Sequence, residues 1–157
     1  CTITRNDATA GSGGGALLEG GVLRWCTLVD NSATDGGGGV HCGTGGGEII
    51  ECIVAFSESG YGVAAEEGCA PALDCCDVYQ NPAGNYDSVV GDQTGTDGNF
   101  SLDPQFCGWE YANYWLFDTS PCAYGNNPCD HQVGALGVGC DDPVETMSWG
   151  RLKALWK

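Results

Sequence analysis

Positively charged side chains are scarce in this sequence. Its 157 residues include five lysines and arginines against 21 aspartates and glutamates, which gives a formal net charge of −16. Nucleic acids and anionic membrane surfaces bind proteins through clustered Lys and Arg, so we expect neither as a partner. A strongly acidic surface is compatible with divalent cations and with neutral or cationic ligands.

Long apolar runs and metal-binding cysteine pairs are also missing. No stretch approaches the roughly 20 apolar residues of a membrane-spanning helix, so the sequence predicts no membrane span. There is no C-x-x-C pair, and the two histidines, His41 and His131, stand far apart in sequence. Both observations argue against structural zinc.

Glycine and cysteine are abundant instead. The 27 glycines permit tight turns and close approach of backbone segments. Eleven cysteines in a chain of this length indicate an oxidising compartment, so we predict an exported protein, secreted or held at the cell surface. We expect these cysteines to form disulfides and to leave at most one free thiol after denaturation.

A repeat of about 25 residues occupies the first half of the chain. The segments CTITRN, CTLVDN, CIVAFS and CDVYQN begin at residues 1, 26, 52 and 76, so their spacings are 25, 26 and 24 residues. Glycine clusters follow the first two segments, at 13–15 and 36–39. Short apolar triplets repeated at this period predict a solenoid of strands.

Alternation within each repeat predicts which side chains fill the core, because successive side chains of a strand point to opposite faces. The residues expected to face inward are Cys1, Cys26, Cys52, Cys76, Ile3, Leu28, Val54, Val78, Ala16, Val40, Val63, Leu18, Cys42 and Ala65. Those expected on the other face of the first strand are Thr2, Thr27, Ile53 and Asp77. Asn6, Asn31 and Asn81 close these strands, where Asn tolerates left-handed backbone and its amide forms hydrogen bonds between coils.

These units carry a resemblance to known proteins. CTITRNDATAGSGGGALL and CTLVDNSATDGGGGVHC resemble right-handed parallel β-helix repeats, in the N-x-A…G-G-G-[AV] order of polymorphic outer-membrane and autotransporter-type passenger repeats. NFSLDPQFCGWEYANYWLFDTSPCA (99–123) is similar to the endings of bacterial pectate-lyase-like β-helix proteins. The resemblance covers most of residues 1–140 and implies the fold and a bacterial source. It implies no single activity, because this fold includes lyases, hydrolases, adhesins and inert spacers.

We therefore predict an all-β chain in three parts. Residues 1–81 form about four coils of a right-handed parallel β-helix, 82–140 an irregular last coil and a cysteine-rich cap over the open end, and 141–157 a short helical tail. Because Cys1 begins in mid-coil, we expect upstream coils of a longer parent protein. The tail is either a helix that lies on the cap or a sorting tag.

Four cysteines of the cap, Cys107, Cys122, Cys129 and Cys140, are expected to form its disulfides. Four cysteines allow three pairings. We favour Cys107–Cys122 and Cys129–Cys140, which join neighbours in sequence.

One outward column in the coils has residue types used in catalysis. Glu19 and Glu66 are expected two coils apart, roughly 9–10 Å by strand spacing, with His41 between them. This separation lies near the upper end of the range of about 6.5–9.5 Å in inverting glycosidases. Surface glutamates on an acidic protein explain the same residues, and we favour that interpretation, so no catalytic residue is assigned.

A glycine-rich loop, GDQTGTDGNFSLD (91–103), contains Asp92, Asp97, Asn99 and Asp103. Oxygen ligands on a flexible loop suit structural Ca²⁺, but their spacing departs from the EF-hand order and Asx turns explain them equally well.

The function predicted from the sequence is non-enzymatic. We expect an exported β-helix segment with a structural or adhesive role, which binds a polysaccharide or a cell-surface ligand and needs no cofactor. The alternative is a carbohydrate-active β-helix enzyme, either a polysaccharide lyase or a glycoside hydrolase.

Overall fold

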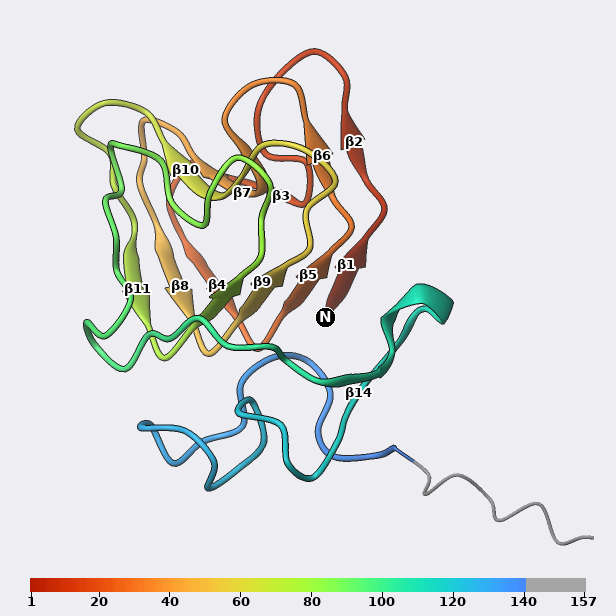
Figure 1. The fold of residues 1–157 in the computed structure, drawn as a ribbon. Helices are drawn as coiled ribbons and strands as arrows, with labels where there is room; N and C mark the ends of the chain where they lie inside the picture. The colour runs from red at the N-terminus through yellow and green to blue at the C-terminus, as the bar shows by residue number, and fades with distance from the viewer. Residues whose placement is uncertain (141–157) are drawn as a thin grey trace, which may run out of the picture.

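The computed structural model describes residues 1–140, which wind through three parallel sheets (Figure 1). The first sheet consists of β1 (Thr2–Thr4), β5 (Thr27–Val29), β9 (Ile53–Ala55) and β12 (Asp77–Tyr79). The second consists of β3 (Ala16–Leu18), β7 (Gly37–Cys42) and β10 (Tyr61–Ala65), and the third of β4 (Val22–Arg24), β8 (Glu48–Ile50) and β11 (Ala72–Asp74). A short pair, β2 (Asp7–Ala8) with β6 (Ser32–Ala33), extends the turn after the first sheet.

The pairing register follows the sequence repeat. Thr2 pairs with Thr27, Thr27 with Ile53, and Ile53 with Asp77, at the same spacings as the cysteines beside them. The predicted parallel β-solenoid is confirmed. It has about three turns rather than four, because the second and third sheets contain three strands each and β12 continues into an irregular segment.

The interior contains the columns that alternation predicted, except that Cys1 is exposed. The main core cluster includes the ladder cysteines Cys26, Cys52 and Cys76 together with Leu28, Val54 and Val78, and Ile3 packs against it from the first coil. The thiol of Cys52 donates to the carbonyl of Ile50 at 3.1 Å, and that of Cys76 to the carbonyl of Ile49 at 3.2 Å. The cysteines therefore fill the narrow interior as small apolar side chains with a weak donor.

Residues in left-handed conformation stand at both ends of the first sheet's strands. Those that follow the strands, with φ of 49–57°, are Arg5, Asp30, Phe56 and Gln80, named here the exit column. Those that precede the strands, with φ of 51–52°, are Trp25, Glu51 and Cys75, named here the entry column. The prediction that Asn6, Asn31 and Asn81 adopt this conformation is wrong by one position, because the bend occurs at the residue before each of them.

The predicted asparagine hydrogen bonds between coils are confirmed. Oδ1 of Asn31 accepts from the backbone and side-chain nitrogens of Asn6 at 3.1 and 3.0 Å, and its amide donates to the carbonyl of Ile3 at 2.8 Å. Asn81 repeats the pattern, since its Oδ1 accepts from the backbone of Ser57 and its amide donates to the carbonyl of Val54.

Residues 82–101 form an irregular last coil over the end of the solenoid. Tyr86 bridges to Val63 and Phe100 to Asp77, and Val90 is buried in the main core cluster. Asn99 turns inward, with its Oδ1 accepting from the backbone of Cys76 at 2.9 Å. This coil covers the core at that end.

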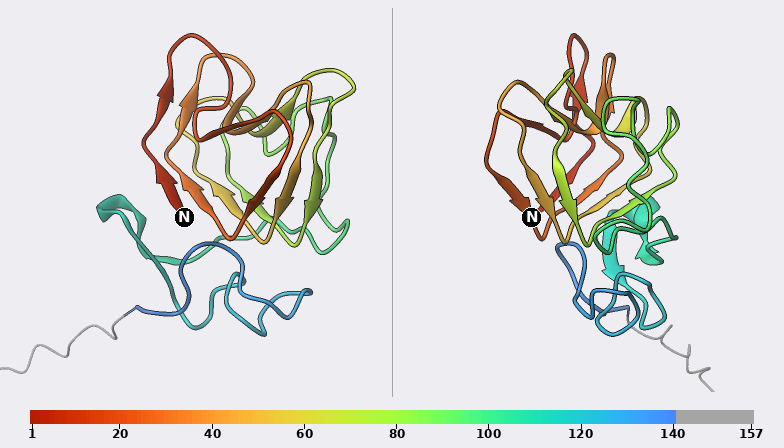
Figure 2. Two further views of the ribbon diagram at one scale, coloured as in Figure 1. Left: turned by 180° about the vertical axis from the view of Figure 1, so that it is seen from behind. Right: turned by 90° about the vertical axis from the view of Figure 1, so that its left-hand side faces the viewer.

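The C-terminal segment, residues 103–140, packs beside the solenoid and not over its end (Figure 2). It contains β13 (Phe106–Gly108), a 3-10 turn η1 (Trp109–Tyr111) and β14 (Asn113–Leu116), which pairs antiparallel with β13. The residues that form a second core cluster between segment and sheet are Val29, Ile53, Ala55, Phe100, Phe106, Tyr114, Leu116, Cys122 and Val133. The predicted position of the cap, over the open end of the solenoid, is therefore wrong. Because the segment packs against the first sheet instead, the outward side chains of Thr27, Ile53 and Asp77 are buried.

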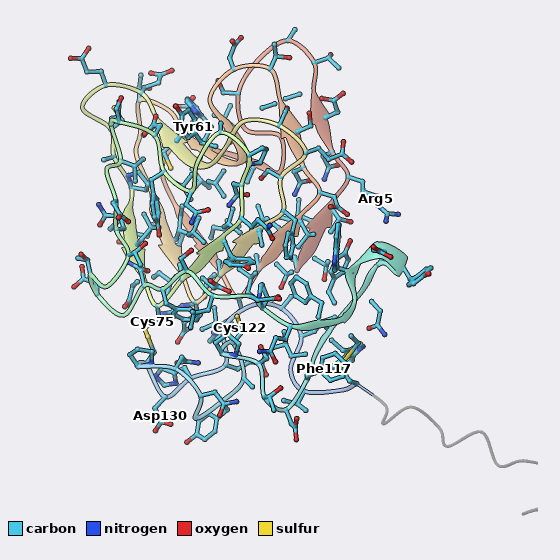
Figure 3. The ribbon with its side chains drawn as sticks, viewed as in Figure 1. Arg5, Tyr61, Cys75, Phe117, Cys122 and Asp130 are labelled. Carbon is cyan, nitrogen blue, oxygen red and sulfur yellow. A yellow bond between two sulfur atoms is a disulfide. The ribbon has the colours of Figure 1, made fainter. Side chains whose placement is uncertain are left out.

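The predicted disulfide pairing is also wrong. Cys75 pairs with Cys129, which ties the entry column to the C-terminal segment, and Cys107 pairs with Cys140 inside the segment (Figure 3). Cys122 is unpaired and buried, because it packs over the first sheet with its thiol 3.2 Å from Oδ2 of Asp77. The unpaired cysteines number seven, where at most one was expected: Cys1, Cys26, Cys42, Cys52, Cys69, Cys76 and Cys122.

Within residues 1–140 the structure contains no helix with the length and apolarity needed to cross a membrane. The predicted helical tail at 141–157 lies outside the described residues.

Candidate functional site

The three acid–base candidates from the sequence, Glu19, His41 and Glu66, do not share one column of the second sheet. The pairing of Leu17 with His41 and of His41 with Ala64 confirms the predicted register. His41, however, is only 8% exposed, and the loop at Gly36 covers its ring, so it does not face solvent as predicted. Glu19 accepts a hydrogen bond from the Thr44 hydroxyl at 3.2 Å.

The glycine-rich loop uses its oxygens in local hydrogen bonds. Asp92 accepts from the backbone of Thr94 and Asp103 from that of Gln105, both at 2.9 Å, as in Asx turns. Asn99 is directed into the core instead of toward the loop. Across residues 1–140 no group of three or more His, Cys, Asp or Glu side chains is placed to hold a metal ion.

A groove of about 1080 Å³ lies between the solenoid and the C-terminal segment. One wall consists of exit-column residues and the turn after them, and the other of the segment's first residues and hairpin. The residues that line this aromatic groove are Asp30, Phe56, Ser57, Glu58, Gln80, Asn81, Pro82, Asp103, Gln105, Phe106, Trp109, Phe117 and Thr119.

Stacked aromatic rings join the two walls. The rings of Phe56 and Trp109 lie nearly parallel, 5.0 Å apart with an interplanar angle of 11°. Phe56 also meets Phe106 at 6.5 Å and Tyr79 edge-on at 5.7 Å. Trp109 and Phe117 stay partly exposed, so the groove presents apolar ring surface to solvent. Offset and edge-on ring pairs of this kind fix the rings in place.

Carboxylates add polar character to the groove. Asp30 is buried, and Nε of Arg5, which is labelled in Figure 3, lies 3.7 Å from its Oδ2. Burial raises the pKa of Asp30 above its ordinary value, the positive charge of Arg5 opposes this shift, and the nearby Glu58 adds to it. Glu58 and Asp103 are exposed, so the groove offers solvated acceptors around an apolar floor.

Sequence reasoning did not identify this groove. One position of the repeat hints at the groove in the sequence. Phe56 is aromatic there, whereas the equivalent residues Arg5, Asp30 and Gln80 are polar. The aromatic cluster at 109–117 stood out in the sequence, but its contact with Phe56 depends on where the C-terminal segment docks.

Comparisons with protein-family models, with curated proteins and with solved structures find no match to this chain.

Proposed function

We propose that this chain is a non-enzymatic binding module, the β-helix segment of an exported protein, which holds a saccharide chain in the aromatic groove. The observation that carries the proposal is the Phe56–Trp109 stack, flanked by the solvated acceptors Glu58 and Asp103. Sugar rings have an apolar face that packs on aromatic rings and hydroxyls that donate to carboxylates, so the two features match one ligand class.

Charge favours a neutral saccharide over an acidic one. The groove's charged lining residues are Asp30, Glu58 and Asp103, all acidic, and Arg5 at its margin is already paired with Asp30. A uronate chain would bring like charge to these carboxylates without a free cation to meet it. The two disulfides and the resemblance to exported β-helix proteins support a role outside the cell.

Binding is tested with neutral hexasaccharides of glucose, xylose, mannose and N-acetylglucosamine, and with polygalacturonate as the acidic comparison. We expect calorimetry to detect one or more neutral chains and Trp109→Ala to weaken binding about tenfold. Trp115→Ala is the matched control, since Trp115 is a partly exposed indole outside the groove. The absence of binding to every neutral chain, or equal loss in both variants, contradicts the proposal.

A hydrolase is the second candidate, favoured by one observation. Burial raises the pKa of Asp30, although Arg5 opposes the shift, and Asp30 lines the same groove as Glu58, so two carboxyl groups face one ligand space. New reducing ends that appear with wild-type protein and disappear with Asp30→Asn would identify hydrolysis, whereas retention of intact chains supports the binding module.

A further inference from the structure

A second cavity, of about 460 Å³, lies at the other end of the first sheet's strands. Its solenoid wall is Trp25 and Glu51 of the entry column, and its other wall is residues 131–135 of the C-terminal segment, with His131 and Gln132. This Trp25 cavity shares no lining residue with the aromatic groove. Its volume falls within the usual range of about 300–1,000 Å³ for small-ligand sites.

Trp25 supplies a fixed apolar surface. Its backbone is held in the left-handed region, where its amide donates to the carbonyl of Ile50 at 3.2 Å. The guanidinium of Arg24 lies 5.3 Å from the centre of the indole and covers part of it. The side chain nevertheless remains 56% exposed, so part of the indole is open to a ligand.

Glu51 places an acceptor with unused capacity in the same wall. Its amide donates to the carbonyl of Asp74 at 2.9 Å, and its carbonyl accepts from Gly134 at 2.8 Å, so both neighbours fix its backbone. Its Oε2 is buried and accepts no hydrogen bond from the described residues. Nε of Arg24 is 3.6 Å from this oxygen, close enough for charge attraction and too far for a hydrogen bond.

The charges in this region balance. Arg24 and Glu51 form an ion pair, so the pair has no net charge. This wall therefore offers an acceptor but does not select an ionic ligand. Buried acceptors normally have a donor, and the charge of Arg24 takes that role for Oε2. A ligand reaches Glu51 where this residue lines the cavity. A ligand that fits needs an apolar face for the indole and a neutral donor for the carboxylate.

We propose that the Trp25 cavity is a second binding site, which takes a single neutral sugar ring. The ring packs its apolar face on the indole of Trp25, and one of its hydroxyls donates to the Glu51 carboxylate. His131 and Gln132 provide further hydrogen-bonding groups from the opposite wall. The site does not depend on the aromatic groove, and a chain bound at both places would span the C-terminal segment.

Indole N–H signals of the full ¹⁵N-labelled chain distinguish the two sites. The signals of Trp25 and Trp109 are assigned from Trp25→Ala and Trp109→Ala, and the protein is titrated with the four neutral hexasaccharides. We expect a saturable shift of the Trp25 signal with at least one saccharide, unchanged by Trp109→Ala. Glu51→Gln should weaken this response about fivefold, because hydrogen bonds to an ionised acceptor are roughly twice as strong as neutral ones.

Glu48→Gln is the matched control, because Glu48 is an exposed acid on β8 outside the cavity. The proposal is overturned if no saccharide moves the Trp25 signal, or if Glu51→Gln binds as tightly as Glu48→Gln. A shift of Trp109 without a shift of Trp25 supports the groove and rejects this cavity, and the reverse result rejects the groove alone.

Discussion

Every strand of the coils at residues 1–81 pairs in parallel with a strand about 25 residues away, whereas the segment at residues 103–140 forms an antiparallel hairpin within itself. The coils are stabilised by columns of like residues and contain no disulfide between coils. The segment has no repeat, and it is held by Cys107–Cys140 internally and by Cys75–Cys129 to the solenoid. Stacked repeats thus stabilise the coils, and disulfides stabilise the C-terminal segment, which has no repeat.

The largest effect is expected inside the coils. Val54 is fully buried in the main core cluster, so Val54→Asp places an unpaired charge among apolar side chains. We expect the free energy of unfolding to fall by at least about 4 kcal/mol, measured by urea denaturation. Val22→Asp is the matched control at a 58% exposed strand position and should change it by less than about 1 kcal/mol. Similar losses in both variants would refute the inward register.

Removal of the disulfide between the two regions should affect the segment more than the coils. We expect Cys75→Ala with Cys129→Ala to destabilise docking of the segment by about 3 kcal/mol, since this bond closes 54 residues of chain. Hydrogen exchange should become faster at the amide of Val133, which donates to the carbonyl of Cys122. The amide of Ile53 in the coils, which donates to the carbonyl of Cys26, should stay protected. Cys69→Ala, at an unpaired and half-buried cysteine, is the control. Equal loss of protection in both regions would show that they unfold as one unit.

The contact between the two regions should respond to pH. Asp77 is fully buried beneath the segment, and desolvation raises its pKa to about 7 although its hydrogen bonds to Leu102 and Cys122 oppose the shift. Because the pKa is higher in the folded state, the stabilising contribution is complete below the unfolded value of about 4 and is lost as pH rises through 7.

Asp77→Asn mimics the neutral acid, so it should be about 4 kcal/mol more stable than wild type at pH 8 and equal to it near pH 4. Urea denaturation across this range measures the difference. Asp74→Asn changes an exposed neighbouring acid and should leave the pH profile of wild type in place. A profile that Asp77→Asn leaves unchanged would mean that Asp77 is ionised in the folded protein.

The last prediction changes no residue and concerns the number of reactive thiols. Five unpaired cysteines are buried, and burial raises the pKa of Cys42 to about 11 and that of Cys76 to about 12. Such thiols react slowly. We expect a maleimide to label two cysteines in the native protein, Cys1 and Cys69, and seven in denaturant, counted by mass spectrometry. Fewer than seven in denaturant would indicate disulfides between ladder cysteines.

The coils could be predicted because their register repeats in the sequence. A period of about 25 residues fixes which side chains stack, and alternation fixes which of them face inward. The position of the C-terminal segment has no such periodic signal. A hint exists in Val29, Ile53 and Ala55, which are apolar on the outward face and therefore need a second layer. What covers them follows from tertiary packing, which also decides that Cys129 meets Cys75 and not Cys140.

The candidate sites depend on the same docking. The aromatic groove joins Phe56 to Trp109, and the Trp25 cavity joins Glu51 to Gly134. Each pair is separated by more than 50 residues and crosses the boundary between repeat and segment. The sequence therefore pointed to Glu19, His41 and Glu66, whose positions the repeat relates, and missed residues whose proximity no repeat encodes.

The buried sulfur column also dictates the order in which the molecule must mature. An unfolded chain with eleven accessible thiols has many wrong partners for each of them. Folding of β topologies takes milliseconds to seconds, whereas disulfide formation takes seconds to hours. Coils that close first therefore remove Cys26, Cys42, Cys52 and Cys76 from exchange before most oxidation occurs. Folding of the coils thereby limits which cysteines remain available to form disulfides with the C-terminal segment. An oxidant that reached the chain before the coils closed would trap it in crosslinked, misfolded forms.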